Sequence, residues 1–119
     1  MSIRRVVPDI KSERFGESRE FYVELLGFEV GMDSDWIVTF VSPTNPTAQV
    51  SVMKRDATAG VQPHLSIEVA DVDAVYARAR ERGDDVVYPL TAEPWGVRRF
   101  FVRDPNGQVI NVLSHREER

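Results

Sequence analysis

Apolar and polar positions alternate in short runs that predict strands, and two longer stretches show helical periodicity. The first half of the chain predicts a strand over Ile3–Ile10, a helix over Glu17–Leu26, and strands over Phe28–Met32, Trp36–Val41 and Ala48–Met53. Pro8 indicates an edge or bulged strand, because proline has no N–H for a sheet ladder. Phe21, Leu25 and Phe28 recur at i, i+4 and i+7, so we expect them in the core. Gly27 supplies the residue that ends the helix.

The same order of elements returns in the second half. Residues 55–63 follow neither periodicity and predict a linker. After it come a strand over His64–Val69, a helix over Val72–Arg82, and strands over Asp85–Tyr88, Val97–Arg103 and Val109–Ser114. Asp71 caps the helix and Gly83 ends it. Two βαβββ modules, about residues 3–54 and 64–115, therefore indicate an internal duplication and an α+β fold.

Length and composition limit the classes of protein that fit. A chain of 119 residues with 42% hydrophobic and 29% charged residues is typical of one globular domain, here 1–119. The net charge of -4, without a basic run, favours neither nucleic acid nor membrane as a partner. The absence of cysteine excludes disulfides and thiolate sites. We expect a cytoplasmic protein, because no apolar segment follows the N-terminal arginines, and we expect the charged end, 115–119, to fray.

Two segments resemble motifs of one known superfamily. The run EFYVELLGF at 20–28 is similar to FYxxxLGF, and FFVRDPNGQVI at 100–110 is similar to FxxDPxG. Both motifs belong to the vicinal oxygen chelate superfamily, which includes glyoxalase I, extradiol dioxygenases, fosfomycin-resistance thiol transferases and metal-free bleomycin-resistance proteins. The resemblance covers essentially the whole chain and implies a cup-shaped, mostly antiparallel eight-stranded sheet with helices on its convex side. It also implies a homodimer, and it defines the fold far better than the reaction.

Metal-using members of that superfamily carry ligands at four positions on the concave face. The resemblance puts these positions at Val7, Ser51, His64 and Asn111. Only His64 is a good ligand, and one imidazole with a hydroxyl and an amide gives a divalent ion little affinity. We therefore expect no metal cofactor. Two alternatives stay open: a displaced divalent-metal site that joins His64 to Glu68 or Asp9, and a His64 that is merely hydrogen-bonded in the cup or exposed at its mouth.

Strand alternation places one set of side chains on the concave face. The residues expected to bind a ligand are Trp36, Met53, His64, Glu68, Trp95, Arg99, Phe101 and Asn111. This mixture of an apolar floor with a few polar groups is typical of a small-molecule pocket. Glu68 and Arg99 alternatively form a structural ion pair. The tryptophans suit stacking on a planar or cationic ligand, although Trp95 alternatively plugs the core or a dimer seam.

Three functions fit these features. The leading hypothesis is a small-molecule binding protein that works without a metal, for example by sequestering an antibiotic or a metabolite. The alternative is a metal-dependent or metal-free enzyme of the lyase, isomerase or dioxygenase type, with His64 or Glu68 as general base. A third is a partner-binding module whose cup is filled by its own side chains. No Ser/His/Asp arrangement, P-loop or dinucleotide glycine motif supports a hydrolase, kinase or dehydrogenase.

Overall fold

The computed structural model describes residues 2–115; residue 1 and residues 116–119, most of the end expected to fray, lie outside the described residues. The first half contains β1 (Ile3–Lys11), α1 (Phe15–Arg19), a π-helical continuation η1 (Glu20–Leu25), β2 (Glu29–Asp33), β3 (Ile37–Val41) and β4 (Gln49–Met53). The second half contains β5 (Leu65–Val69), α2 (Val72–Arg82), β6 (Val86–Ala92), β7 (Val97–Arg103) and β8 (Val109–His115). Each half therefore has the predicted βαβββ order.

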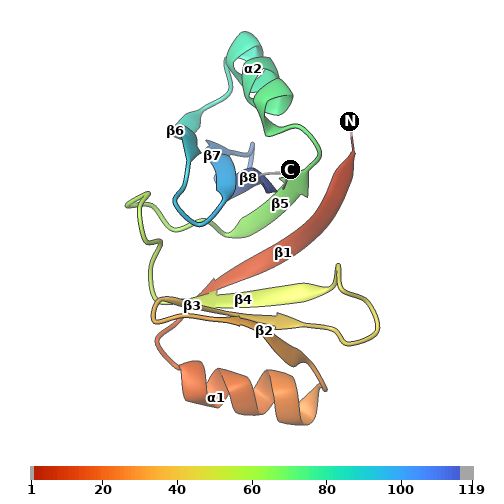
Figure 1. The fold of residues 1–119 in the computed structure, drawn as a ribbon. Coiled ribbons are helices and arrows are strands. Elements are labelled where there is room, and N and C mark those ends of the chain that lie inside the picture. Colours follow the sequence, from red (N-terminus) through yellow and green to blue (C-terminus); the bar gives the residue numbers. More distant parts are fainter. Residues whose placement is uncertain (1, 116–119) are drawn as a thin grey trace.

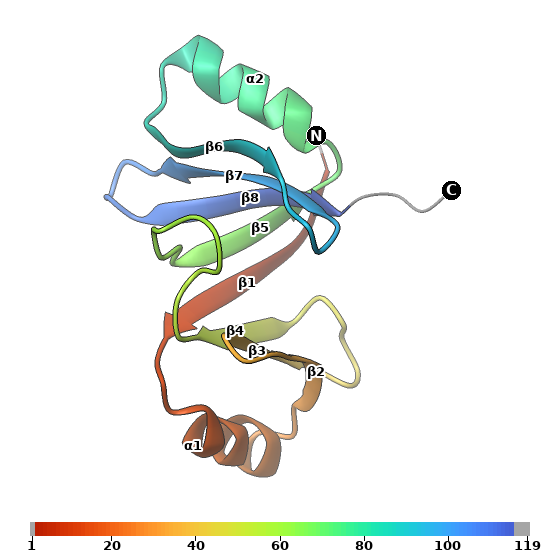
Figure 2. The same ribbon diagram turned by 60° about the vertical axis from the view of Figure 1, so that its left-hand side comes forward.

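The strands form one eight-stranded sheet in the order β2-β3-β4-β1-β5-β8-β7-β6. Within each half the first strand is parallel to the last, β1 with β4 and β5 with β8, and the other pairs are antiparallel. The halves join where β1 pairs with β5 at the middle of the sheet. One helix lies beside each half, α1 by β2–β4 and α2 by β5–β8, and the sheet stays open (Figures 1 and 2). The predicted α+β fold is confirmed.

Of the two alternatives predicted from Pro8, an edge or a bulged strand, the edge strand is wrong, because β1 lies between β4 and β5. The register of β1 with β5 does shift, but between Ile3 and Arg5 and not at Pro8. Pairing with β4 runs from Asp9 to Lys11, preceded by an isolated bridge between Val6 and Ala48. Pro8 falls in the gap between these contacts, so its missing N–H removes no ladder bond there. A central strand thus accommodates a proline where its ladder is interrupted.

The predicted core stripe of the first helix is wrong for Phe21 and Leu25 and confirmed for Phe28. Phe21 is 50% exposed and Leu25 is 68% exposed, whereas Tyr22 and Phe28 pack against the core around Phe40. The reason is the π turn over Glu20–Leu25, whose i→i+5 bonds wind fewer turns per residue than an α-helix and rotate the side chains that follow. The α-helical spacing read from the sequence therefore selects the wrong face.

The second half follows its predicted pattern closely. The Asp71 side chain accepts a hydrogen bond from the Ala74 amide at 3.2 Å and caps α2, and Gly83 ends it with φ of 79°. Alternate residues of β7 and β8, among them Phe100 and Val112, pack under this helix. Their neighbours in the strands face the other side of the sheet, where a cavity lies. Within residues 2–115, neither helix has the length and apolar character needed to cross a bilayer.

Candidate functional site: a cavity across the two halves

A cavity of about 490 Å³ lies on the sheet face opposite the helices, over the junction of the two halves. Its lining comes from both, with Ser51 and Met53 of β4 on one side and Arg99 of β7 with Asn111 of β8 on the other. The volume falls within the range of sites that hold small organic ligands. Because β1 and β5 are central, their side chains form the floor.

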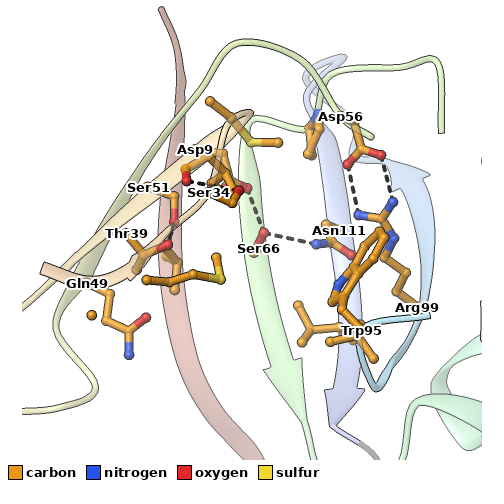
Figure 3. A pocket seen from close by; sticks show the side chains of 18 of the residues that line it. Asp9, Ser34, Thr39, Gln49, Ser51, Asp56, Ser66, Trp95, Arg99 and Asn111 are labelled. Atoms are coloured by element: carbon orange, nitrogen blue, oxygen red, sulfur yellow. Dashed lines mark hydrogen bonds and ion pairs between the residues drawn. The ribbon is translucent and has the colours of Figure 1, made fainter. Parts of the chain in front are cut away.

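Three polar side chains are linked across that floor (Figure 3). The amide Nδ2 of Asn111 donates to Ser66 Oγ at 3.0 Å, and the Ser66 hydroxyl donates to Asp9 Oδ2 at 2.6 Å. Asn111 is only 7% exposed, and its Oδ1 is buried with no hydrogen-bond partner among residues 2–115. A buried acceptor without a partner costs free energy, so it favours a ligand that brings a donor.

Asp9 is the titratable group in this row of hydrogen bonds from Asn111 through Ser66. Burial raises its pKa to about 7, the hydrogen bond from Ser66 opposes the rise, and the negative charge of Asp56 adds to it. The positive charges of Arg5 and Arg99 lower the pKa by smaller amounts. The carboxyl therefore changes its protonation state near neutral pH inside the cavity.

A second polar pair lies beside Asp9, where β3 meets β4. The hydroxyls of Thr39 and Ser51 are 2.8 Å apart, and both residues are buried and line the cavity. Ser51 is also the register partner of Asp9 across β1 and β4. This part of the floor is polar but carries no charge.

Arg99 is the centre of a buried ion-pair network. Its guanidinium donates to both carboxylate oxygens of Asp56, at 2.7 and 2.9 Å, and to Glu93 Oε2 at 2.7 Å. A fourth bond reaches Thr58 Oγ1 at 2.9 Å. The side chains of Arg99, Asp56 and Glu93 are 4%, 1% and 3% exposed. Burial alone would raise the pKa of Asp56, but the bonds from Arg99 and from the amides of Ala59 and Thr58 lower it overall.

Two tryptophans form an apolar part of the wall. The rings of Trp36 and Trp95 lie 5.7 Å apart and are tilted by 57° to each other. The guanidinium of Arg99 lies 5.2 Å from the Trp95 ring centre and fixes that ring from one side. Trp95 is 42% exposed, so it lies at the cavity wall and does not plug the core.

A second group of charges lies where β1 pairs with β5. Arg5 lies opposite Glu68 in the β1–β5 register and donates to its carboxylate at 2.6 Å, and His115 lies 2.9 Å from the same group. The proposed Glu68–Arg99 pair is therefore wrong. β8 lies between the strands that carry these two residues, and the β1–β5 register gives Glu68 a different partner.

The residues at the superfamily's metal positions do not fit a divalent ion. Val7 has no donor atom, Ser51 is bonded to Thr39, and His64 is exposed, with its Nδ1 accepting a bond from the Val109 amide at 2.9 Å. Among residues 2–115 no three His, Cys, Asp or Glu side chains come close enough to share a metal. The displaced site also lacks support, since Glu68 is engaged by Arg5. That the protein works without a metal nevertheless stays a prediction.

The structure separates the residues expected to bind a ligand into two groups. The cavity lining includes Trp36, Met53, Trp95, Arg99 and Asn111. His64, Glu68 and Phe101 do not line it. His64 lies at an exposed strand end, and Phe101 is fully buried beneath the Arg99 guanidinium, 4.8 Å from its ring centre. A binding role stays a prediction for every member of both groups.

Sequence reasoning missed the importance of Asp9, Asp56 and Glu93. Asp9 entered only as an alternative metal donor, although its position two residues after Val7 placed it on the inner face. Asp56 and Glu93 belong to connections between strands, where no periodicity indicates which side chains turn inward. The sequence carries no signal for their pairing with Arg99.

The comparisons with known proteins agree with this architecture. The family model of the Glyoxalase/Bleomycin resistance protein/Dioxygenase superfamily matches residues 8–112. The chain belongs to this superfamily. No protein of curated function matches the sequence.

Solved structures of similar fold include a superfamily member from Vibrio splendidus 12B01, at 21% identity, TM-score 0.72, and coverage of 96% of this chain and 99% of that one. A second is methylmalonyl-CoA epimerase from Mycobacterium tuberculosis, at 18% identity, TM-score 0.68, and coverage of 97% and 88%. A third, described as NAD-dependent benzaldehyde dehydrogenase from Legionella pneumophila, shares 18% identity with TM-score 0.74 over 93% and 99%. At these identities the similarity shows a common fold, and function has to be argued from the site.

Proposed function

We propose that this superfamily member binds a small organic molecule in the cavity without the help of a metal ion. The observation that carries the proposal is the cavity of about 490 Å³, which combines two tryptophans with a hydrogen-bonding floor that includes Ser51 and Asn111, two of the superfamily's four metal positions. Apolar walls with a few fixed polar groups supply affinity and orientation together. Sequestration of an antibiotic or metabolite is one use of such binding.

Intrinsic fluorescence gives a direct test. The chain has two tryptophans and both line the cavity, so the emission of the protein reports on this site alone. We expect saturable quenching by at least one compound from a panel of small aromatic and alicyclic metabolites and antibiotics, with a matching rise in Tm. Equal binding by metal-free protein treated with a chelator supports the metal-independent form.

Two alanine variants locate the binding. Met53→Ala removes contacts from a cavity residue that is 3% exposed, and should weaken binding. Ile10→Ala changes a residue that is 39% exposed and does not line the cavity, and should leave affinity unchanged. Absence of saturable quenching and of any Tm rise across the panel would refute the proposal, as would an equal loss of affinity in both variants.

A second candidate is a metal-free enzyme that uses Asp9 as its acid or base. The observation in its favour is the pKa of Asp9, raised by burial to about 7 within the cavity, where a general acid–base group works well at neutral pH. His64 and Glu68, the bases expected from sequence, do not line the cavity. Turnover of a bound compound whose rate changes around pH 7, and its loss in Asp9→Asn, would establish this activity.

A homodimer and a cytoplasmic location also belong to the proposal. Exposed apolar side chains on η1 and at its end, among them Phe21, Leu25 and Leu26, support self-association because a second copy would remove them from water. Light scattering coupled to size-exclusion chromatography measures the mass in solution. Fractionation of expressing cells tests the location.

A further inference from the structure

We infer that the cavity recognises an organic ammonium ion, with its charged head at Asp9 and Asn111 and its apolar body against Trp36 and Trp95. This inference rests on the proposed binding function and names the chemical class of the ligand.

The floor offers acceptors that have no donor. Asn111 Oδ1 is buried and has no hydrogen-bond partner among residues 2–115, and the residue as a whole is only 7% exposed. Asp9 accepts a bond from Ser66 through Oδ2, and no bond within residues 2–115 reaches its Oδ1. An ammonium group carries several N–H donors and no acceptor, which complements a floor that offers unsatisfied acceptor oxygens.

The charges around the site also favour a cationic ligand. The guanidinium of Arg99 is held by two carboxylates, those of Asp56 and Glu93, and Arg5 is bonded to Glu68. Among residues 2–115, the two arginines that line the cavity are therefore already paired with carboxylates other than Asp9. A bound cation would supply the missing charge, whereas a bound carboxylate would meet Asp9 without a partner.

Every charged or titratable neighbour of Asp9 fits this balance. They are Arg5 and Lys11 on its own strand, Asp56 and His64 in the β4–β5 connection, Glu68 on β5, Arg99 on β7 and His115 on β8. Lys11 is exposed near the strand end, and His64 is exposed with one ring nitrogen bonded to a backbone amide. The raised pKa of Asp9 agrees with a carboxylate that lacks a cationic partner.

The wall selects the rest of the ligand. Arg99 already occupies one side of the Trp95 ring, which leaves the tryptophan pair better suited to an apolar or aryl body than to the charged head. Met53 and Leu113 add apolar surface to the same cavity. An arylalkyl ammonium ion combines both requirements in one molecule.

The test compares ligands that differ only in their head group. Benzyl, phenethyl and indolylethyl scaffolds are titrated by calorimetry at about pH 8, each as the ammonium, the alcohol and the carboxylate. We expect at least one ammonium to bind about tenfold or more tightly than its alcohol, and the matching carboxylate to bind more weakly still. This part uses unmodified protein, so it does not depend on the folding of a variant.

Variants then assign the preference to the floor. Asp9→Asn should reduce the ammonium-to-alcohol ratio to within about threefold, and Asn111→Leu should lower ammonium affinity by removing the unpartnered acceptor. Asp85→Asn is the matched control, because it removes one negative charge at a side chain that is 64% exposed and does not line the cavity.

The outcomes separate this inference from the proposed function. Binding of the alcohol or carboxylate as tightly as the ammonium overturns the inference and leaves a binding protein. A preference that survives in Asp9→Asn, or that falls equally in Asp85→Asn, also overturns it. If none of these compounds binds, the inference fails, and the broader fluorescence panel decides the proposed function separately.

Discussion

Replacement of Arg99 by methionine should destabilise the protein more than any change to a surface charge. Arg99 makes four side-chain hydrogen bonds, to Asp56, Glu93 and Thr58, and its removal leaves two carboxylates of 1% and 3% exposure without a cationic partner. Breaking a buried ion pair from one side costs about 3 to 5 kcal/mol. For a domain of this size that loss lowers Tm by about 12 to 20 °C.

The pH dependence should reverse as well. In the wild type the folded state lowers the pKa of Asp56, so this group contributes stability above its unfolded pKa, and the contribution is lost as pH falls. In Arg99→Met the buried Asp56 carboxylate loses its cation, and burial then raises its pKa above the unfolded value. The variant should therefore gain stability relative to the wild type as pH falls from about 7 towards 4.

Urea unfolding followed by circular dichroism, at neutral and at mildly acidic pH, measures both effects. Arg98→Met is the matched control, because Arg98 is next to Arg99 in the sequence but pairs with Asp73 at the surface, where the two side chains are 44% and 58% exposed. Its loss of stability should stay within about 1 kcal/mol. A triple variant, Asp56→Asn with Glu93→Gln and Arg99→Met, should recover much of the loss because no charge is left buried. Equal stability of Arg99→Met and Arg98→Met would show that the network contributes nothing, and a parallel pH dependence would refute the electrostatic explanation.

Three further predictions test other features. Burial raises the pKa of Asp9 to about 7, so ionisation opposes folding as pH rises from about 4 to 7; Asp9→Asn should remove this loss, worth at most about 1.4 kcal/mol per pH unit in urea titrations. Gly83→Ala should cost about 1 kcal/mol in thermal unfolding, because φ is 79° in open space, whereas Gly16→Ala, inside α1 and equally open, should be neutral or stabilising. The tryptophan pair should give an exciton couplet in circular dichroism that disappears in Trp36→Phe and in Trp95→Phe alike; a couplet surviving either change contradicts the 5.7 Å contact.

Local signals explain how much of the fold was predictable. The helix at Val72–Arg82 was predicted with its observed bounds, because Asp71 satisfies free amides at one end and Gly83 adopts a left-handed backbone at the other. Strand alternation separated the buried side of β7 and β8 from the side that faces the cavity. Each of these signals acts within a few residues, so the sequence displays it directly.

The errors came from features that act over longer distances or alter the local period. The π turn moved Phe21 and Leu25 to the surface, and no spacing in the sequence distinguishes it from an α-helical turn. Pro8 indicated an edge or bulged strand, yet the interruption of the β1–β4 ladder lets it lie in a central strand. Strand neighbours, and therefore the partner of Glu68, follow from the order of all eight strands.

The sequence by itself determined two βαβββ modules and the ends of the second helix. It also determined that Met53, Arg99 and Asn111 lie on the strand faces that point to the cavity. Only the tertiary structure decided that Asp56 and Glu93 enclose Arg99 and that Ser66 joins Asp9 to Asn111. The physical reason is the distance along the chain over which each interaction acts. Backbone preferences and strand alternation are properties of neighbouring residues, whereas pairing of charges and burial of a carboxyl arise only when distant segments are brought together by one sheet register.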